Sequence, residues 1–488
     1  MTGTSETAAT TADLRGQVRS AVIWRSGTQI FSQIVAWAST FLVIRILSPT
    51  DYGLFAMTSV VLVLLTLLNG YGFANAAIQQ RDGGEQQLRQ LFGLLIVINA
   101  ALAALQFFAA PLVAAYYRQP VVADLLRVQS LIYLTTPFLA LGYTVLARQM
   151  DFRRQAQVNV ASALIGAAVS LGGALSGLGV WTLVAAPLAT FASRGFGMVL
   201  AARTLIWPSF DFRGVRKLTD YGGMVMVGQL FWFIQSQADI VIAGRSFAPY
   251  ELGLYTTSLF LAQIFVNKVV PPLNEVAFSA YAQIQDDTRA VADGFLLSVR
   301  VILLLAMPFC IGLAAVAEPA VLVALGGKWA PAVPVVRLLA LAMPFMTLHV
   351  LFSPAVCARG RPGISTRASV LGAVAMPLAF FLGVRWGAAG LATAWLVTYP
   401  VLLAVTAAWS LPVIGARPGE LARAALPPAL AGLGMGLGVT LIDRLLPQMP
   451  ELARLGALVT SGGVLYLGWL MAFARERLVE LVDLVRRR

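Results

Sequence analysis

The chain has 488 residues, of which 59% are hydrophobic and only 12% are charged. Soluble domains carry about 25% charged residues, so this chain cannot cover a soluble surface, and we expect an integral membrane protein. The formal net charge of +13 would suggest nucleic acid in a soluble protein. Cytoplasmic loops of membrane proteins accumulate arginine and lysine, however, so we expect no nucleic-acid partner.

Hydropathy and polar breaks predict an all-α fold with about 14 transmembrane helices. The segments are too long for the roughly ten-residue strands of an outer-membrane barrel. The lead has no apolar core, so we expect no cleaved signal peptide. In chain order, the predicted parts are a cytoplasmic lead (1–20), a six-helix bundle (21–202), a cytoplasmic linker (203–218), a second six-helix bundle (219–410), two additional transmembrane helices (411–474) and a basic cytoplasmic tail (475–488).

One stretch of the first bundle recurs in the second. The octapeptide SPTDYGLF at 48–55 returns as APYELGLY at 248–255, and a segment that begins at Gly179 returns at Gly387. Proline fixes a turn, and each acidic residue lies where a helix N-terminus favours negative charge, so each copy is predicted to be a capped turn between two helices. The duplication predicts two bundles in a parallel, pseudo-twofold repeat, with the last two helices outside it.

Basic residues predict the orientation of the chain in the membrane. When the N-terminus is placed inside, most of the 35 lysines and arginines fall in cytoplasmic segments. Because such residues favour the cytoplasmic side, we expect both termini in the cytoplasm.

Several segments resemble a known family. They are IRILSPTDYGLFAM at the first copy of the repeat, GFANAAIQQRD and LARQMDFRRQA in the first bundle, and QADIVIAGRSF before the second copy. They look like the polysaccharide-specific flippases, in the WzxC-like PST branch of the multidrug/oligosaccharidyl-lipid/polysaccharide (MOP) exporter superfamily. The resemblance implies a bacterial inner-membrane flippase for undecaprenyl-pyrophosphate-linked oligosaccharide repeats, used in O-antigen, exopolysaccharide or capsule synthesis.

The resemblance also implies partners and a mechanism. The substrate and membrane lipids would be partners, with a glycan polymerase and chain-length machinery as further candidates. The two bundles would alternate access to a central cavity. In related lipid flippases, extra helices such as the last two border a groove for the polyprenyl tail.

Charged side chains at membrane depth are costly, about 2.5–3.5 kcal/mol each on insertion scales, so each is a candidate functional residue. We expect a cationic cavity that receives the pyrophosphate. The alternative is that the arginines snorkel to the interface, or, for Arg194 beside Gly195 and Gly197, that the helix forms a packing seam. The candidate substrate-binding residues are Lys268, Arg25, Arg300 and Arg194.

Two acidic residues are candidates for coupling or gating. Glu275 follows Lys268 by two helical turns, beyond a Pro-Pro pair, and either gates that cation or forms a plain structural ion pair with it. Asp239 precedes Arg245, and matching acids recur at this place in the resembling family. For Asp239 this resemblance implies one of two roles, ion coupling or an outer gate with Arg245. An exposed interfacial pair is the alternative. His349, the only histidine, is a candidate proton relay or an interior group whose hydrogen bonds are satisfied.

Polar residues in the spans could bind sugars or tie helices together; these are Gln29, Gln33, Gln229, Gln235, Asn267 and Asn274. No enzyme signature is expected. The segment around Lys328 lacks the first glycine and the Ser/Thr of a phosphate loop, and the cysteines and histidine have no metal-binding spacing. We therefore expect no metal and no cofactor.

Three other functions are alternatives to the flippase. A multidrug or organic-ion exporter of the same superfamily would need acidic residues in its cavity, whereas the charges at depth are mainly basic. A polysaccharide polymerase or ligase would need a long outward loop. A membrane scaffold for glycan-assembly enzymes is the third alternative.

Overall fold

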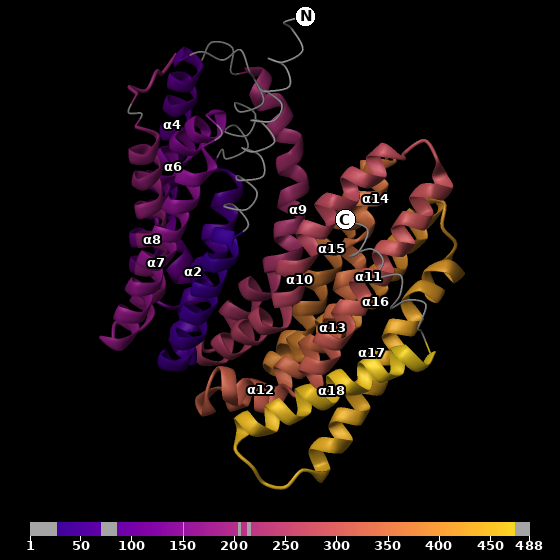
Figure 1. The fold of residues 1–488 in the computed structure, drawn as a ribbon. Helices are drawn as coiled ribbons and strands as arrows, with labels where there is room; N and C mark the ends of the chain where they lie inside the picture. The colour runs from indigo at the N-terminus through magenta and orange to yellow at the C-terminus, as the bar shows by residue number, and fades with distance from the viewer. Residues whose placement is uncertain (1–26, 70–84, 150, 204–205, 212–215, 474–488) are drawn as a thin grey trace, which may run out of the picture. The chain divides into compact units, whose positions relative to one another are not determined.

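The computed structural model describes residues 27–69, 85–149, 151–203, 206–211 and 216–473. Every regular element in these ranges is a helix, which confirms the predicted all-α class (Figure 1). The chain divides into two compact units, Met1–Leu230 (unit 1) and Phe231–Arg488 (unit 2). The predicted lead, the tail and the candidate Arg25 lie outside the described residues.

Unit 1 is a helical bundle in which α8 packs against both α6 and α7, while α4 packs against α6. Proline and serine at the helix starts, and glycine at the turns, set the boundaries between its spans. Its described helices are a first helix (Gly27–Ile46), α2 (Pro49–Leu67), α4 (Glu85–Tyr117), α5 (Val121–Gln129), α6 (Leu131–Arg148), α7 (Phe152–Leu175) and α8 (Val180–Ala202).

Unit 2 repeats this order of neighbours: α16 packs against α13 and α15, and α11 packs against α13. The recurrence agrees with an internal duplication, although the full repeat layout stays a prediction. Its elements are α9 (Arg216–Ser246, which begins in unit 1), α10 (Pro249–Gln283), α11 (Thr288–Ala315), α12 (Ala317–Ala324), η1 (Gly327–Ala332), α13 (Val333–Val350), α14 (Phe352–Ala358), α15 (Pro362–Gly383), η2 (Val384–Trp386), α16 (Gly387–Ile414), α17 (Pro418–Leu445) and α18 (Glu451–Phe473).

Within the described residues, 11 helical stretches are long and apolar enough to cross a membrane. The chain is therefore a multi-pass membrane protein. One of the stretches, Pro362–Ile414, contains two long helices, and α10 lies outside all of them. The count of about 14 spans stays a prediction.

Both copies of the repeated octapeptide are turns that start a helix, as predicted. Ser48 and Asp51 form a capping box at the start of α2, with the Ser48 N–H donating to Asp51 Oδ2 over 2.9 Å. In the second copy, Glu251 reaches across the unit instead: its Oε1 accepts the N–H of Ala388, 3.0 Å away, at the start of α16. The acid thus caps a helix distant in sequence.

The two repeated motifs meet in the folded units. Gly387 has φ 69° and ψ −161°, a region open essentially to glycine alone, and a Cβ there would lie 2.7 Å from Glu251 Oε1. Gly179 has φ 55°, and its Cβ would lie 3.1 Å from Asp51 Oδ1. In each unit, therefore, the acid of the octapeptide lies against a glycine at the start of a later helix: Asp51 against Gly179, before α8, and Glu251 against Gly387, the first residue of α16.

We expect Gly387→Ala to destabilise unit 2 by roughly 1–3 kcal/mol, because the backbone conformation is strained for alanine and the methyl group would meet Glu251. The measurement is thermal unfolding of the detergent-solubilised protein. Gly363→Ala is the matched control, since it lies in α15 and its Cβ would meet nothing within 4 Å. Equal melting temperatures for the two variants would contradict the role of this contact.

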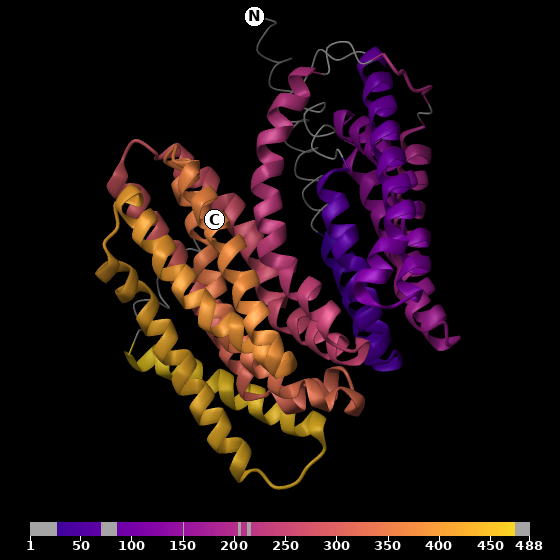
Figure 2. The same cartoon turned by 180° about the vertical axis from the view of Figure 1, so that it is seen from behind.

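The α17–α18 pair lies along one edge of unit 2, as both ribbon views show (Figures 1 and 2). Met435 and Val439 of α17 and Leu458 of α18 join a buried cluster with Ile311 of α11. The Tyr466 hydroxyl of α18 donates to the carbonyl oxygen of Leu304, 2.9 Å away. The last two helices are therefore packed onto the body of the unit.

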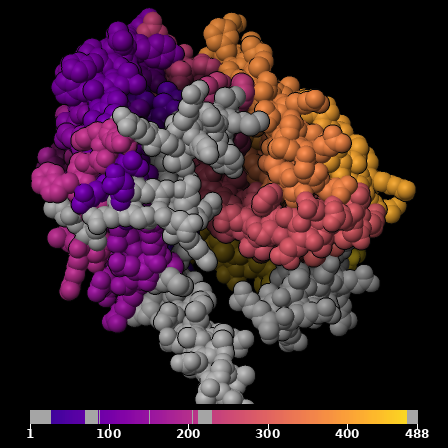
Figure 3. Space-filling view, turned by 90° about the horizontal axis from the view of Figure 1, so that it is seen from above, coloured from indigo at the N-terminus to yellow at the C-terminus, as the bar shows by residue number. Residues whose placement is uncertain are grey.

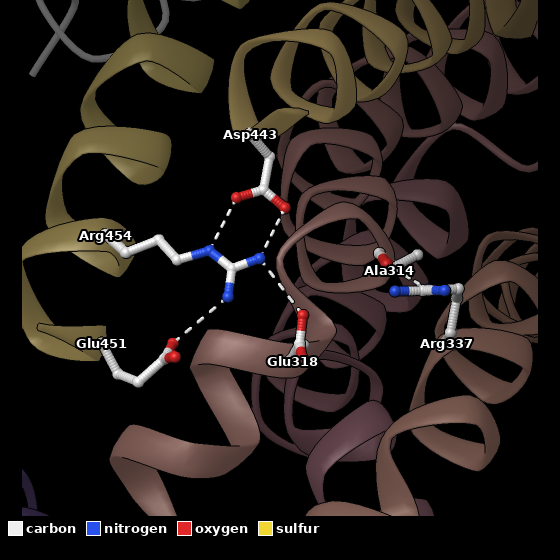
Figure 4. Close-up of polar contacts among 6 residues, drawn as sticks. All are labelled: Ala314, Glu318, Arg337, Asp443, Glu451 and Arg454. Atoms are coloured by element: carbon white, nitrogen blue, oxygen red, sulfur yellow. Dashed lines mark hydrogen bonds and ion pairs between the residues drawn. The ribbon is translucent and has the colours of Figure 1, made fainter. Parts of the chain in front are cut away.

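An ion network centred on Arg454 closes one end of this pair (Figure 4). Its guanidinium donates to both carboxylate oxygens of Asp443, over 2.7 and 2.9 Å, and to Glu318 Oε2 of α12 over 3.1 Å. Glu451 lies 3.5 Å away on the same helix turn. Bidentate geometry in a partly buried network fixes orientation better than an isolated surface pair does.

Arg359 joins three turns at the opposite end of the α17 helix. In the space-filling view of Figure 3, salmon atoms of unit 2 lie beside orange atoms of the same unit. The Arg359 guanidinium donates to the carbonyl oxygens of Gln285 and Val413 and to the Thr288 hydroxyl. It thereby satisfies carbonyl groups near two helix ends that have no partner within their own helix.

Candidate functional site

Unit 1 contains a polar cavity of about 430 Å³. Pockets of this size bind small molecules in many proteins, although most of those are lined mainly by apolar side chains. This lining is unusual for a membrane bundle, because most of its residues carry a hydroxyl, an amide or a charge. The first helix, α6, α7 and α8 contribute Thr28, Gln29, Ser32, Gln33, Ala36, Tyr143, Phe152, Gln155, Ala156, Asn159, Ser162, Ala163, Thr190 and Arg194.

Arg194 is the one charged residue of this lining. Its side chain is half-buried, and its Nε donates to Asn159 Oδ1 over 2.7 Å. Asn159 accepts the hydrogen bond of Arg194 Nε, on one edge of the guanidinium. The two terminal nitrogens of the guanidinium can therefore donate to a ligand in the cavity. An arginine held in this way is suited to bind a phosphate or carboxylate group.

The packing seam expected at Gly195 and Gly197 is also present. A Cβ at Gly195 would lie 2.8 Å from the carbonyl oxygen of Thr135 in α6, and one at Gly197 would lie 2.9 Å from Val158 in α7. The two hypotheses for this part of α8, a binding residue and a packing seam, are therefore compatible. The glycines let α8 approach its neighbours, while Arg194 lines the cavity.

Sequence reasoning identified Gln29, Gln33 and Arg194 but missed the contribution of α7. Gln155, Asn159 and Ser162 are spaced at i, i+4 and i+7, so they share one face of that helix. A polar stripe at helical spacing within an apolar span could have revealed them. With that stripe, α7 supplies hydrogen-bonding groups along the cavity wall.

Unit 2 contains a second polar cluster, centred on Asp239. The carboxylate of Asp239 is fully buried; its Oδ2 accepts the Tyr255 hydroxyl over 2.6 Å, and its Oδ1 accepts the Ile240 N–H over 2.8 Å. Trp395 Nε1 donates in turn to the Tyr255 hydroxyl over 2.8 Å. Residues from α9, α10 and α16 thus hold one carboxylate in the core.

The alternative of an exposed interfacial pair between Asp239 and Arg245 is wrong. Arg245 is exposed at the end of α9, while Asp239 is buried and directs its hydrogen bonds to Tyr255 and Ile240. The two residues are six positions apart, so they lie on different faces of α9. An acid buried at such a cost must serve either a precise structural role or a functional one.

Aromatic rings extend the Asp239 cluster towards His349. Trp395 stacks on Tyr399 with ring centroids 5.3 Å apart, and His349 meets Tyr399 edge-on at 5.9 Å. His349 is buried in α13, and its Nδ1 has no hydrogen-bond partner in the described part of the chain. The interior position expected for a lone histidine is therefore confirmed, but the expected hydrogen bond is not found at Nδ1 within the described residues. A relay role stays a prediction.

The other charged candidates of unit 2 lie elsewhere on its surface or in its walls. Lys268 and Glu275 are both exposed on α10, which continues through Pro271 without ending. Arg300 is half-buried on α11. A shared chamber for the four predicted cations stays a prediction, as does the gating or ion-pair role of Glu275.

Among the predicted polar residues, Asn274 ties two helices of unit 2 together. Asn274 Nδ2 donates to the carbonyl oxygen of Val350, 3.3 Å away in α13. The buried Gln235 side chain lies so close to Gly372 of α15 that a Cβ there would clash with it. Asn267 is exposed and donates within α10 to Gln263 Oε1 over 3.4 Å, while Gln229, in the part of α9 that belongs to unit 1, is exposed.

Several known proteins are similar to this chain in sequence or in fold. The succinoglycan biosynthesis transport protein ExoT of Rhizobium meliloti (strain 1021) is 29% identical over 451 residues, 91% of this chain and 90% of that protein. The lipopolysaccharide biosynthesis protein WzxC of Escherichia coli (strain K12) is 22% identical over 306 residues, 60% of each chain. The lipid II flippase MurJ, in an inward closed conformation, has a similar fold, with a TM-score of 0.73 and 15% identity over 93% of this chain and 99% of that one.

These comparisons confirm the resemblance that the sequence motifs indicated. The sequence profile described as "Polysaccharide biosynthesis protein" matches residues 42–334, more than half of the chain, from the first helix to α13. The chain therefore belongs to this family of polysaccharide biosynthesis proteins, and its fold is similar to that of the lipid II flippase MurJ.

Proposed function

We propose that this protein is a flippase that moves lipid-linked oligosaccharide repeat units across the bacterial inner membrane. The observation that carries the proposal is the polar cavity of unit 1, in which amides, hydroxyls and Arg194 gather inside an apolar bundle. The names of its relatives, a transport protein for succinoglycan biosynthesis and a lipopolysaccharide biosynthesis protein, support the substrate class.

The chemistry of the cavity suits a glycan with an anionic head group. Moving an amide or hydroxyl out of water without a replacement hydrogen bond costs roughly 2–7 kcal/mol, so a sugar needs polar partners along its path. Glutamine and asparagine side chains both donate and accept, and a guanidinium binds phosphate oxygens in pairs. None of the described residues that line the cavity is acidic, whereas a multidrug cation exporter would need an acid there.

The remaining predicted residues enter the proposal in defined roles. Lys268, Arg300 and Arg25 would supply further positive charge for the pyrophosphate, in a cycle of alternating access. Asp239 would couple transport to an ion gradient, with Glu275 and Arg245 as gating groups. Both termini would lie in the cytoplasm, and a glycan polymerase with its chain-length machinery would receive the exported repeats.

Cells that lack this protein test the proposal. We expect intact lipid-linked repeat units to accumulate in the cytoplasmic leaflet, with loss of the surface polymer, because assembly continues while translocation stops. The measurement is the amount of lipid-linked oligosaccharide and its accessibility to a membrane-impermeant glycosidase in oriented vesicles.

Complementation provides the control for this experiment. The wild-type gene should restore export, and a Lys268→Ala variant at equal membrane abundance should not. Normal polymer in cells without the protein, or repeats that still reach the outer leaflet, would overturn the proposal.

A further inference from the structure

The α7–α8 wall of the polar cavity carries its hydrogen-bonding groups in a fixed order. Asn159 and Ser162 of α7 line this wall, together with Thr190 and Arg194 of α8. Asn159 is hydrogen-bonded to Arg194, and Gly166 of α7 lies against Thr190, because an added Cβ there would clash with the Thr190 hydroxyl. Thr190 and Arg194 are four residues apart, so they are separated by about 6 Å along the helix axis.

The two hydroxyl groups of this wall are already used as donors. Ser162 Oγ donates to the carbonyl oxygen of Val158 over 2.8 Å, and Thr190 Oγ1 donates to that of Ala186 over 2.8 Å. A hydroxyl group has one hydrogen and two lone pairs, so both oxygens are left as acceptors. This part of the wall can accept hydrogen bonds from the hydroxyl groups of a sugar, but it disfavours an anion.

The orientation of the Asn159 amide is fixed by Arg194. A guanidinium Nε–H can only donate, so the amide atom that faces it over 2.7 Å is the acceptor Oδ1. The other polar atom of the same amide is Nδ2, which carries two N–H donors. The Asn159–Arg194 end of the wall therefore offers donors, whereas the Ser162–Thr190 end offers acceptors.

We propose that Asn159 and Arg194 together form an oxoanion site, in which the Asn159 amide binds the ligand through Nδ2 and is more than a tie between α7 and α8. The guanidinium pairs with two oxygens of a phosphate or carboxylate group, and the amide adds a further donor to one of them. Ser162 and Thr190, one turn away, accept from the hydroxyl groups of a sugar beside that anion. The inference rests on the proposed function and deepens it, because it assigns a second ligand-binding group and the chemical class that this group takes.

A purely structural tie between α7 and α8 predicts a different effect of Asn159→Asp. The aspartate keeps an oxygen for Arg194 Nε and makes that hydrogen bond charge-assisted, so a tie would be preserved or strengthened. An oxoanion site would instead lose the Nδ2 donors and gain a negative charge beside the bound anion. The same substitution therefore separates the two roles.

Anion binding to the full-length protein in detergent tests the proposal, with the dissociation constant taken from the ligand-dependent rise in melting temperature. The probes are inorganic pyrophosphate and glucuronate, which represent the lipid head group and an acidic sugar as sources of the oxoanion, and glucose is the uncharged comparison. We expect Asn159→Asp to weaken binding of the anion that the wild type prefers by roughly ten-fold or more, since a hydrogen bond to a charged group is lost and a like charge is added.

Gln157→Glu is the matched control. It makes the same amide-to-carboxylate change on an exposed residue of α7 that does not line the polar cavity, so anion binding should match that of the wild type. Asn159→Ala removes the amide without adding charge and should also weaken anion binding, which keeps the test valid if the aspartate disturbs folding. Unchanged affinity for both anions in the Asn159 variants, equal weakening by Gln157→Glu, or a wild type that binds neither anion would overturn the inference.

Flipping of a fluorescent polyprenyl-pyrophosphate disaccharide by the wild type in liposomes keeps this inference distinct from the proposed function. If the wild type flips the probe but the Asn159 variants bind both anions normally, the oxoanion site fails while the proposed function stands. If the wild type does not flip the probe, the proposed function fails whatever the anions show.

Discussion

Replacing Arg194 by glutamine is expected to lower glycan export roughly 10- to 100-fold at unchanged membrane abundance. A hydrogen bond to a charged group contributes about 1.5–3 kcal/mol, and each 1.4 kcal/mol is a factor of ten. Glutamine keeps an amide that can still bond Asn159, but it removes the charge that the anionic head requires. Loss of a costly cation at membrane depth should not hinder insertion, so the variant is expected to fold.

The measurement is export in the complemented deletion strain, with abundance read from a tagged protein in isolated membranes. Arg153→Gln is the matched control, because Arg153 is an exposed arginine on α7 that does not line the cavity. Arg194→Lys should recover part of the activity, since it retains charge but not the planar fork. A parallel fall in abundance and export would instead assign Arg194 to packing.

Much of the fold could be predicted from the sequence because a membrane imposes a simple rule on composition. Long apolar segments had to be helices, since each backbone group needs an internal partner in lipid. The octapeptide at 48–55 and its copy at 248–255 could be recognised as turns from proline and acid alone. The partners of those acids could not: Glu251 caps α16 at Ala388, and that contact depends on how distant helices pack.

The candidate site was only partly predictable for the same reason. A single charged residue at membrane depth is a candidate functional residue because it is costly there, and Arg194 was predicted on that ground. Asn159, which orients it, is neutral and lies on another helix. Asp239 was noticed as an acid, but its burial depends on Tyr255 and Trp395, which come from α10 and α16.

The sequence also does not show which side chains the packed helices cover. The glycines beside Arg194 suggested a packing seam in place of a binding residue, yet the structure has both on different faces of α8. Lys268 was predicted as a cavity residue from its depth in the helix, but its side chain is exposed on unit 2. Periodicity indicates which residues share a face but not what covers that face.

The Asp239 cluster suits the coupling role proposed for it, because hydrogen bonds hold the buried carboxylate in a fixed position. The Tyr255 hydroxyl is held between Asp239 and Trp395, at 2.6 and 2.8 Å, so removal of a proton or cation would leave the carboxylate in place. Tyr255→Phe would leave the buried carboxylate with one fewer donor, which costs roughly 1–3 kcal/mol. That variant should therefore lose stability as well as transport.

We expect Asp239→Asn to remove the dependence of transport on an ion gradient and to lower export about 5- to 150-fold, the range given by a coupling free energy of about 1–3 kcal/mol. Asparagine can still accept the Tyr255 hydrogen bond, so the fold should persist, but it cannot bind or release a proton or balance a cation. The measurement is flipping in proteoliposomes under an imposed proton or sodium gradient. Asp293→Asn is the control, because that acid is exposed on α11 and pairs with Arg289 at the surface over 3.0 Å. An Asp239→Asn protein that still responds to the gradient as the wild type does would show that the buried carboxylate is structural and that coupling lies elsewhere.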